Sequence, residues 1–338
     1  MGGGRMPAGD GERPRRLRRL RGWGGVTGMA LACAVTAAVA LLPLARHEDG
    51  AGRTGTGRVV QSAPATVPAD TCRDPEASLT PAAVDGPAVA RIKAAGKLVA
   101  GVDQNSYRWG YRNPASGQLE GFDIDLVKAI AKDILGDENA VIYRAIPTSE
   151  RIPALKAGRV DVVVRTMTVN CKRLEDVAFS TAYFETGPQV LAPKNSPITG
   201  YDASLKGRRI CSASGSTAET QLKAKSFGAD ISTTVPNQLD CLVRLQLGEV
   251  DGMVTDNALA AGLAAQDPSV RLVGQPFAQE FYGVAMNKGA EDLVRRVNKV
   301  LEDYRRGGAN SPWMTAYRKW LAADLPGITA PPAPEYRD

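Results

Sequence analysis

The chain has 338 residues, 43% of them hydrophobic, so it can bury a core in one or two compact domains and still carry a tail. Its formal net charge of +6 comes from the amino-terminal end, where residues 1–25 hold seven arginines against one aspartate and one glutamate. The rest of the chain is nearly neutral, which argues against a nucleic-acid ligand.

An uncharged apolar run at residues 26–44 follows this basic arm. The run is about long enough to cross a bilayer, and the arginines before it predict that the amino terminus lies in the cytoplasm. A cleaved signal peptide and a lipid anchor on Cys33 are the competing interpretations. All three export the rest of the chain. We expect an uncleaved anchor in the cell membrane, followed by a flexible linker at 45–95 that contains Cys72.

Short apolar runs then alternate with helical patterns. Strands are predicted at 97–102, 141–146 and 160–165, and helices at 122–135 and 152–157. Later strand candidates are 189–191, 209–212, 231–235, 252–255 and 283–286. This alternation indicates an α/β protein with mostly parallel sheets and helices on both faces, and the number of strands favours two small sheets over one.

The segment 160–180 joins a valine-rich strand to a polar loop that contains Thr166, Thr168 and Arg173. In open α/β sheets, ligands bind outside the carboxyl ends of the strands. The planar guanidinium of Arg173 suits a carboxylate at that place. The alternative is a surface arginine without a ligand.

Four cysteines, Cys72, Cys171, Cys211 and Cys241, make an even set in an exported body. They allow three pairings, between which the sequence alone does not choose. No CxxC spacing occurs and the only histidine is His47, so we expect structural disulfides and no metal or other cofactor. Free buried thiols are the alternative.

The body resembles the type 3 extracellular solute-binding proteins of ABC amino-acid transporters. The likeness covers about residues 96–321 and rests on the order and spacing of several segments. They include GFDIDLVKAIA (121–131), RIPALKAGRVDVVV (151–164), TMTVNCKRLEDVAFSTAYF (166–184), LQLGEVDGMVTD (245–256) and FYGVAMNK (281–288). The likeness extends to actinobacterial glutamate-, aspartate- and glutamine-binding proteins, including their cysteines.

The resemblance implies a two-lobe clamshell of the type II periplasmic-binding-protein class, with two hinge crossings and a ligand cleft. Lobe 1 is expected to hold residues 96–186 and 285–321, and lobe 2 residues 187–284. A Pro-rich tail at 322–338 should be extended. With these lobes, Cys211 pairs with Cys241, and Cys72 pins the linker to Cys171.

The resemblance also assigns roles to residues. Arg173 is expected to bind the ligand α-carboxylate, with Thr166 and Thr168 beside it. Ser216 and Thr217 open a helix whose free N–H groups suit an anion, although Ser216 also fits a capping box. Asp256 is expected to pair with the ligand ammonium, with a helix N-cap as its alternative.

Specificity is expected to depend on Arg151 and Thr148, which match the residues that bind a side-chain carboxylate in acidic amino-acid receptors. The alternative is a surface Arg151 that pairs with Glu150 or Glu120. Asp103 departs from the acidic pattern, because glutamine receptors carry Asp there. Trp109 is the candidate for apolar contact with the ligand, with a core role as its alternative.

The leading hypothesis is therefore a membrane-tethered, extracytoplasmic receptor that delivers glutamate or aspartate to an ABC importer. A glutamine or asparagine receptor is one alternative, and an amino-acid sensor coupled to a membrane partner and a kinase is another. A dehydratase of the same fold is disfavoured, because the body has no histidine to act as acid or base. For the same reason, ligand affinity is expected to be nearly flat between about pH 5.5 and 8.

Overall fold

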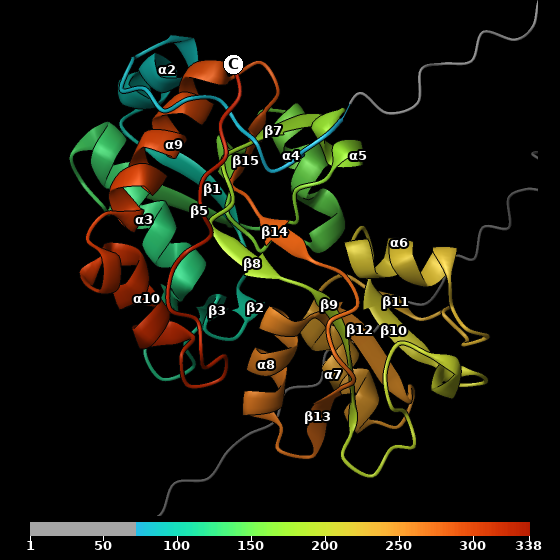
Figure 1. The fold of residues 1–338 in the computed structure, drawn as a ribbon. Helices are drawn as coiled ribbons and strands as arrows, with labels where there is room; N and C mark the ends of the chain where they lie inside the picture. Colours follow the sequence, from blue (N-terminus) through green and yellow to red (C-terminus); the bar gives the residue numbers. More distant parts are fainter. Residues whose placement is uncertain (1–71) are drawn as a thin grey trace, which may run out of the picture. The chain divides into compact units, whose positions relative to one another are not determined.

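The structure is a computed structural model that describes residues 72–338 (Figure 1). The expected basic arm, the apolar run 26–44 and the linker up to residue 71 lie outside the described residues. In the part that is described, no helix is both long and apolar enough to span a bilayer.

The first sheet has the strand order β5-β1-β6-β15-β7. Its strands are β1 Leu98–Val102, β5 Val141–Ala145, β6 Val162–Val163, β7 Val177–Phe179 and β15 Ala285–Asn287. β1 is parallel to both β5 and β6, whereas β15 is antiparallel to β6 and β7. We call this sheet, with the helices packed on it, the first lobe.

Helices cover both faces of the first sheet. The larger core lies under α2 Pro87–Ala95, α3 Phe122–Leu135, α9 Glu291–Arg305 and α10 Pro312–Trp320. The other face packs against α4 Arg151–Lys156 and α5 Cys171–Leu174. α3 illustrates why these helices form, since its buried residues recur at helical spacing and Gly136 ends it in the left-handed conformation.

The second sheet has the order β11-β10-β12-β9-β13 and, with its helices, forms the second lobe. Its strands are β9 Pro188–Pro193, β10 Ile210–Ala213, β11 Thr234–Val235, β12 Gly252–Asp256 and β13 Val270–Val273. Its helices are α6 Thr217–Ala224, α7 Gln238–Gln246 and α8 Asn257–Gln266. β10 is parallel to β11 and β12, while β9 is antiparallel to β12 and β13.

Two strands connect the lobes. β8 Phe184–Thr186 and β14 Glu280–Tyr282 pair antiparallel, and they lie between the two sheets in Figure 1. The chain enters β9 directly after β8 and enters β15 directly after β14. Four of the five strands in each sheet run in the same direction, as expected, and the fifth strand, β15 in the first sheet and β9 in the second, is antiparallel to them. The α/β class with two sheets is confirmed.

Smaller elements complete the fold. A three-stranded sheet contains β2 Asn105–Ser106, β3 Gly110–Arg112 and β4 Leu119–Glu120. Single turns of 3-10 helix lie at Thr148–Glu150, Ala203–Leu205 and Gly308–Asn310.

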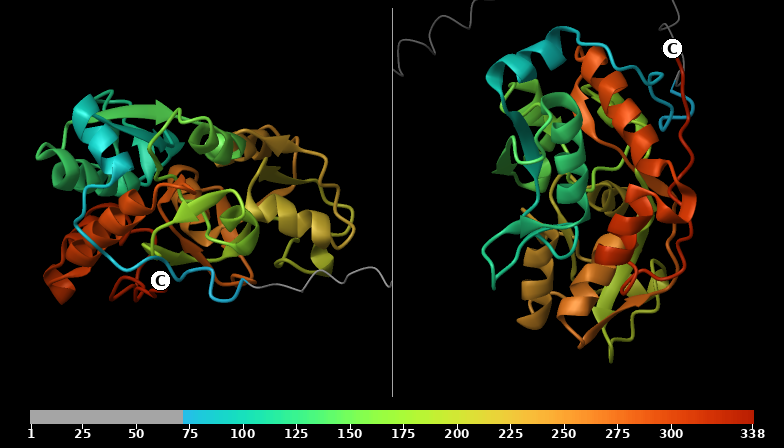
Figure 2. Two further views of the ribbon diagram at one scale, coloured as in Figure 1. Left: turned by 90° about the horizontal axis from the view of Figure 1, so that it is seen from above. Right: turned by 90° about the vertical axis from the view of Figure 1, so that its left-hand side faces the viewer.

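Disulfides and terminal contacts fix the ends of the described chain. Cys72 is bonded to Cys171 at the start of α5, and Cys211 of β10 is bonded to Cys241 of α7. Both pairs are those that the resemblance implies. The carboxyl-terminal tail is ordered beside the segment around Ser78, whose N–H donates to Glu335 O at 3.0 Å (Figure 2).

Candidate functional site

A small cavity of about 10 Å³ lies where the two sheets meet, at the carboxyl ends of β6 and β12. Both lobes supply its walls, so a solute there would be enclosed by the whole fold. The lining residues are Arg151, Thr166, Thr168, Arg173, Ser216, Thr217, Ala218, Gln238, Thr255 and Asp256. Seven of the ten residues that the sequence predicts for the site are among them.

Arg173 is held by the short helix α5. The side chain of Asn170 caps this helix by accepting from the N–H of Arg173 at 2.9 Å. The guanidinium is 8% exposed and donates to Thr168 O at 2.6 Å and, across the lobes, to Gly215 O at 3.2 Å. Burial lowers the pKa of Arg173, while the nearby carboxylate of Glu280 opposes that shift, so the guanidinium stays charged.

Arg151 opens α4 and is 4% exposed. Among the described residues its guanidinium donates only to carbonyl oxygens, including Thr148 O at 2.8 Å and Gly215 O at 3.3 Å. Burial lowers the pKa of Arg151, and the like charges of Arg173 and Arg165 add to that shift. The surface alternative for Arg151 is therefore excluded.

The loop after β6 presents Thr166 and Thr168. Thr166 has a positive φ of 41°, which a β-branched residue adopts only when its surroundings hold it there. Its N–H donates to Asp123 Oδ2 at 3.0 Å, and this buried carboxylate also accepts from Tyr183 OH at 2.9 Å. Burial raises the pKa of Asp123 to about 7. A buried acid under the loop thus fixes its backbone.

The start of α6 forms the opposite wall. Ser216 Oγ accepts from the N–H of Glu219 at 3.0 Å, and Glu219 Oε2 accepts from the N–H of Gly215 at 2.7 Å. The side chain that lines the cavity thus also caps the helix, and ligand binding by Ser216 stays a prediction. Thr217 Oγ1 donates to Glu280 Oε2 at 3.0 Å.

Asp256 ends β12 and faces the same cavity, but its side chain makes no capping bond to α8. Its Oδ2 accepts from Tyr282 OH at 2.6 Å. Burial and the charge of Glu280 raise the pKa of Asp256 to about 7, although the Tyr282 hydrogen bond and Arg173 oppose this. The carboxylate is therefore a buried acceptor that a cation would stabilise.

Two predicted contacts are corrected by the structure. Asp103 is 3% exposed, pairs with Arg165 Nη2 at 3.0 Å and accepts from Ser106 Oγ at 2.8 Å, so it supports the fold instead of lining the cavity. Trp109 is 1% exposed, packs edge-on against Phe184, and donates to Ala258 O at 3.1 Å. It belongs to the core.

Thr148 is also behind the cavity wall. It is 2% exposed, and its Oγ1 accepts from Arg165 Nη1 at 2.9 Å. It therefore supports Arg151 from behind, instead of presenting its hydroxyl to the cavity.

Three polar residues at the site were not predicted. Gln238 and Thr255 line the cavity, and Glu280 is 7% exposed beside it. Glu280 Oε2 accepts from Thr168 Oγ1 at 2.7 Å and Oε1 accepts from Gln221 Nε2 at 3.1 Å. Gln238 is the first residue of α7, and Thr255 precedes Asp256 at the end of its strand. The position of both residues at a helix start or a strand end is the sequence pattern that could have predicted them.

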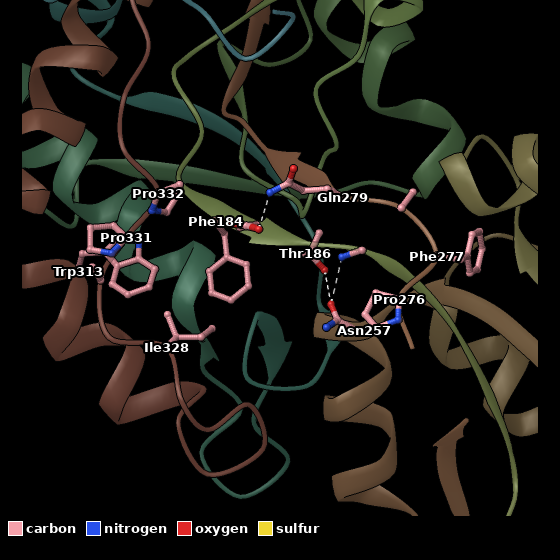
Figure 3. A pocket seen from close by; sticks show the side chains of 14 residues that line it. Phe184, Thr186, Asn257, Pro276, Phe277, Gln279, Trp313, Ile328, Pro331 and Pro332 are labelled. Atoms are coloured by element: carbon pink, nitrogen blue, oxygen red, sulfur yellow. Dashed lines mark hydrogen bonds between the residues drawn. The ribbon is translucent and has the colours of Figure 1, made fainter. Parts of the chain in front are cut away.

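A second, larger cavity of about 680 Å³ lies beside β8 (Figure 3). Phe184, Trp313 and Ile328 give it an apolar wall, and Glu185 accepts from Gln279 Nε2 at 2.7 Å. The 14 residues that line it include no lysine or arginine. Its chemistry suits a carboxylate-bearing solute less well than that of the smaller cavity does.

The fold and the enclosed polar cavity define a two-lobe solute-binding protein. The model of the bacterial extracellular solute-binding proteins, family 3, matches residues 98–323, and the chain belongs to this family. It is thus an extracellular binding protein and not an enzyme.

Relatives are similar over most of their length. A glutamine-binding protein of an ABC transporter from Bacillus subtilis is 36% identical over 70% of this chain and 85% of its own. An L-glutamate/L-aspartate-binding protein from Pseudomonas aeruginosa is 29% identical over 70% of this chain and 80% of its own. The solute receptor for L-cysteine of Neisseria gonorrhoeae has a TM-score of 0.65 at 28% identity, covering 70% of this chain and 94% of that one.

Proposed function

We propose that this chain is an extracytoplasmic receptor that encloses an acidic amino acid, L-glutamate or L-aspartate, and delivers it to an ABC importer. One observation carries this proposal. Arg151 and Arg173 are both buried at one cavity, and within residues 72–338 neither has a carboxylate within salt-bridge distance. Buried charges are expensive unless they are paired, so two ligand carboxylates would supply the missing partners.

The other polar groups suit the rest of such a ligand. Arg173 and the free N–H groups at the start of α6 would bind the α-carboxylate. Asp256 would accept from the α-ammonium, whose charge offsets the cost of ionising that buried carboxyl. Arg151 would then bind the side-chain carboxylate. Binding to the importer and the anchor at residues 26–44 remain predictions.

Glutamine is the second candidate, and Gln238 is the observation in its favour. Its Oε1 is buried at the cavity without a hydrogen-bond partner in the described chain. An amide ligand would donate to this oxygen, whereas a carboxylate has no proton to give. A relative from Bacillus subtilis is named for glutamine.

Calorimetry on the oxidised protein tests the proposal, with L-glutamate, L-aspartate, L-glutamine and L-asparagine as ligands at pH 7.5. We expect Glu or Asp to bind at least tenfold more tightly than the amides. Tighter binding of glutamine would overturn the acidic assignment and would indicate that Gln238 binds the side-chain amide of the ligand. If none of the four binds, the proposal of an amino-acid ligand is wrong.

A further inference from the structure

Arg165 and Asp103 form a buried ion pair at the end of the first sheet. β1 and β6 are parallel with Gly101 opposite Val163, so the residues two positions further along both strands come side by side. Arg165 is 0% exposed, and its Nη2 lies 3.0 Å from Asp103 Oδ2. Both residues belong to the first lobe, so this pair does not depend on how the lobes are placed.

The pair also supports the cavity wall. Arg165 Nη1 donates to Thr148 Oγ1 at 2.9 Å, and the carbonyl of Thr148 accepts from Arg151 Nε at 2.8 Å. The side chain of Arg165 therefore acts on Arg151 through Thr148, while the carbonyl of Arg165 accepts directly from Arg151 Nη1 at 3.4 Å. It is not itself among the residues that line the cavity.

A third contact of Arg165 crosses to the second lobe. Its Nη2 donates to Asn237 Oδ1 at 2.8 Å, and beside it the N–H of Thr148 donates to Pro236 O at 3.1 Å. Asn237 caps α7 in a capping box with Asp240, and Gln238 of the cavity follows it. The contact thus joins the base of Arg151 to the helix that carries the facing wall.

These contacts depend on lobe closure. A solute can reach a cavity walled by both lobes only if the lobes separate, and only β8 and β14 join the two sheets in sequence. Separation would break the Arg165–Asn237 and Thr148–Pro236 bonds and would leave the Arg165–Asp103 pair intact. In the open form, the pair with Asp103 already offsets the cost of burying the Arg165 guanidinium. Closure then adds one charge-assisted hydrogen bond, from Arg165 to Asn237.

We propose that Arg165 is an interlobe latch: Asp103 holds it ready, Asn237 engages it when the lobes close around a solute, and Thr148 transmits its position to Arg151. Arg165 is a positioning residue that does not touch the solute. The inference goes beyond the proposed function, because the latch would act on any solute that fills the cavity.

Asn237→Ser is the variant that separates the latch from helix capping. Serine is as good an N-cap as asparagine, but its side chain is too short to reach Arg165 while capping α7. The full-length oxidised protein would be mixed with L-glutamate, and separately with L-glutamine, in a stopped-flow instrument that follows tryptophan fluorescence. We expect dissociation about tenfold faster, equivalent to about 1.4 kcal/mol, with the association rate within twofold of wild type and the melting temperature unchanged.

Two further variants complete the test. Arg165→Lys keeps a charge for Asp103 but loses the fork that serves three acceptors, so its dissociation rate should rise like that of Asn237→Ser. Gly215→Ala is a reference for impaired closure, because a Cβ there would lie 2.9 Å from Ser149 Cα in the other lobe. X-ray scattering with saturating ligand should show both Asn237→Ser and Gly215→Ala as more open than wild type. A wild-type dissociation rate in Asn237→Ser, or a change only in its melting temperature, would refute the latch.

Discussion

Replacing Arg151 by glutamine should weaken binding of acidic ligands and at the same time stabilise the ligand-free protein. Both effects are expected because Arg151 is 4% exposed and its guanidinium, in residues 72–338, donates only to carbonyl oxygens. Each hydrogen bond to a charged group contributes about 1.5–3 kcal/mol. Loss of two such bonds to a side-chain carboxylate, partly replaced by the new amide, should cost about 3 kcal/mol, or about 150-fold in Kd for glutamate.

The effect on glutamine should be much smaller, because an amide at position 151 can both donate to and accept from an amide ligand. The preference for glutamate over glutamine should therefore fall by about two orders of magnitude. Calorimetry with both ligands measures this ratio directly. Equal losses for the two would show that Arg151 binds the part of the ligand that they share.

The gain in stability has a separate cause. The charge of Arg151 is repelled by Arg173 and Arg165, and this repulsion disappears in Arg151→Gln. Removing a buried, unpaired charge should stabilise the ligand-free fold by about 1–3 kcal/mol, which is about 2–4 °C in Tm per kcal/mol for a domain of this size. Arg159→Gln is the control, since Arg159 is a half-exposed neighbour that pairs with Glu150. A lower Tm in Arg151→Gln would mean that its carbonyl contacts hold the fold together.

Two further predictions concern pH and the disulfides. Burial and Glu280 raise the pKa of Asp256 from its ordinary 3.8 to about 7. Between these pH values the folded protein binds more protons than the unfolded chain. The stability of the ligand-free protein should therefore fall as pH rises from about 4 to about 7. Binding of an ammonium favours the ionised form, so affinity should rise from pH 5.5 to 8, in place of the flat profile expected from the lack of histidine. Calorimetry across this range checks the rise, which Asp256→Asn should abolish. The Cys72–Cys171 bridge closes a sequence separation of 99 residues, so the double serine variant should lose about 2–4 kcal/mol in urea unfolding, and an unchanged midpoint would contradict this.

The sequence identified the elements that carry the site better than it identified the direction of each side chain. Strand 160–165 and its polar loop placed Thr166, Thr168 and Arg173 together, because parallel strands deliver their loops to one edge. Asp103 was misplaced, although it follows β1 at that same edge. The register of β1 on β6 puts it beside Arg165, and this register depends on the assembled sheet.

Trp109 was wrongly predicted at the site and Glu280 was missed, both because their contacts depend on residues distant in sequence. An aromatic residue in a turn-rich loop can point into a cleft or into the core, and neighbours distant in sequence such as Phe184 and Tyr282 decide for the core. Glu280 lies in a crossing strand, where a single sequence gives no sign that it will accept from Thr168 of one lobe and Thr217 of the other. Contacts made only by two lobes together could not be predicted from local patterns.

The charges around the cavity explain why the ligand and the closed form belong together. Asp103 neutralises Arg165 within the first lobe, which leaves Arg151 and Arg173 facing Asp256 and Glu280. Both of these arginines donate to the same carbonyl of the second lobe, that of Gly215, at 3.3 and 3.2 Å. A neutral carbonyl offsets less of the cost of burying a cation than a carboxylate does. At these two arginines the lobes alone therefore gain little when they close, and the proposed ligand, with a carboxylate for each arginine, would supply the free energy that makes closure favourable.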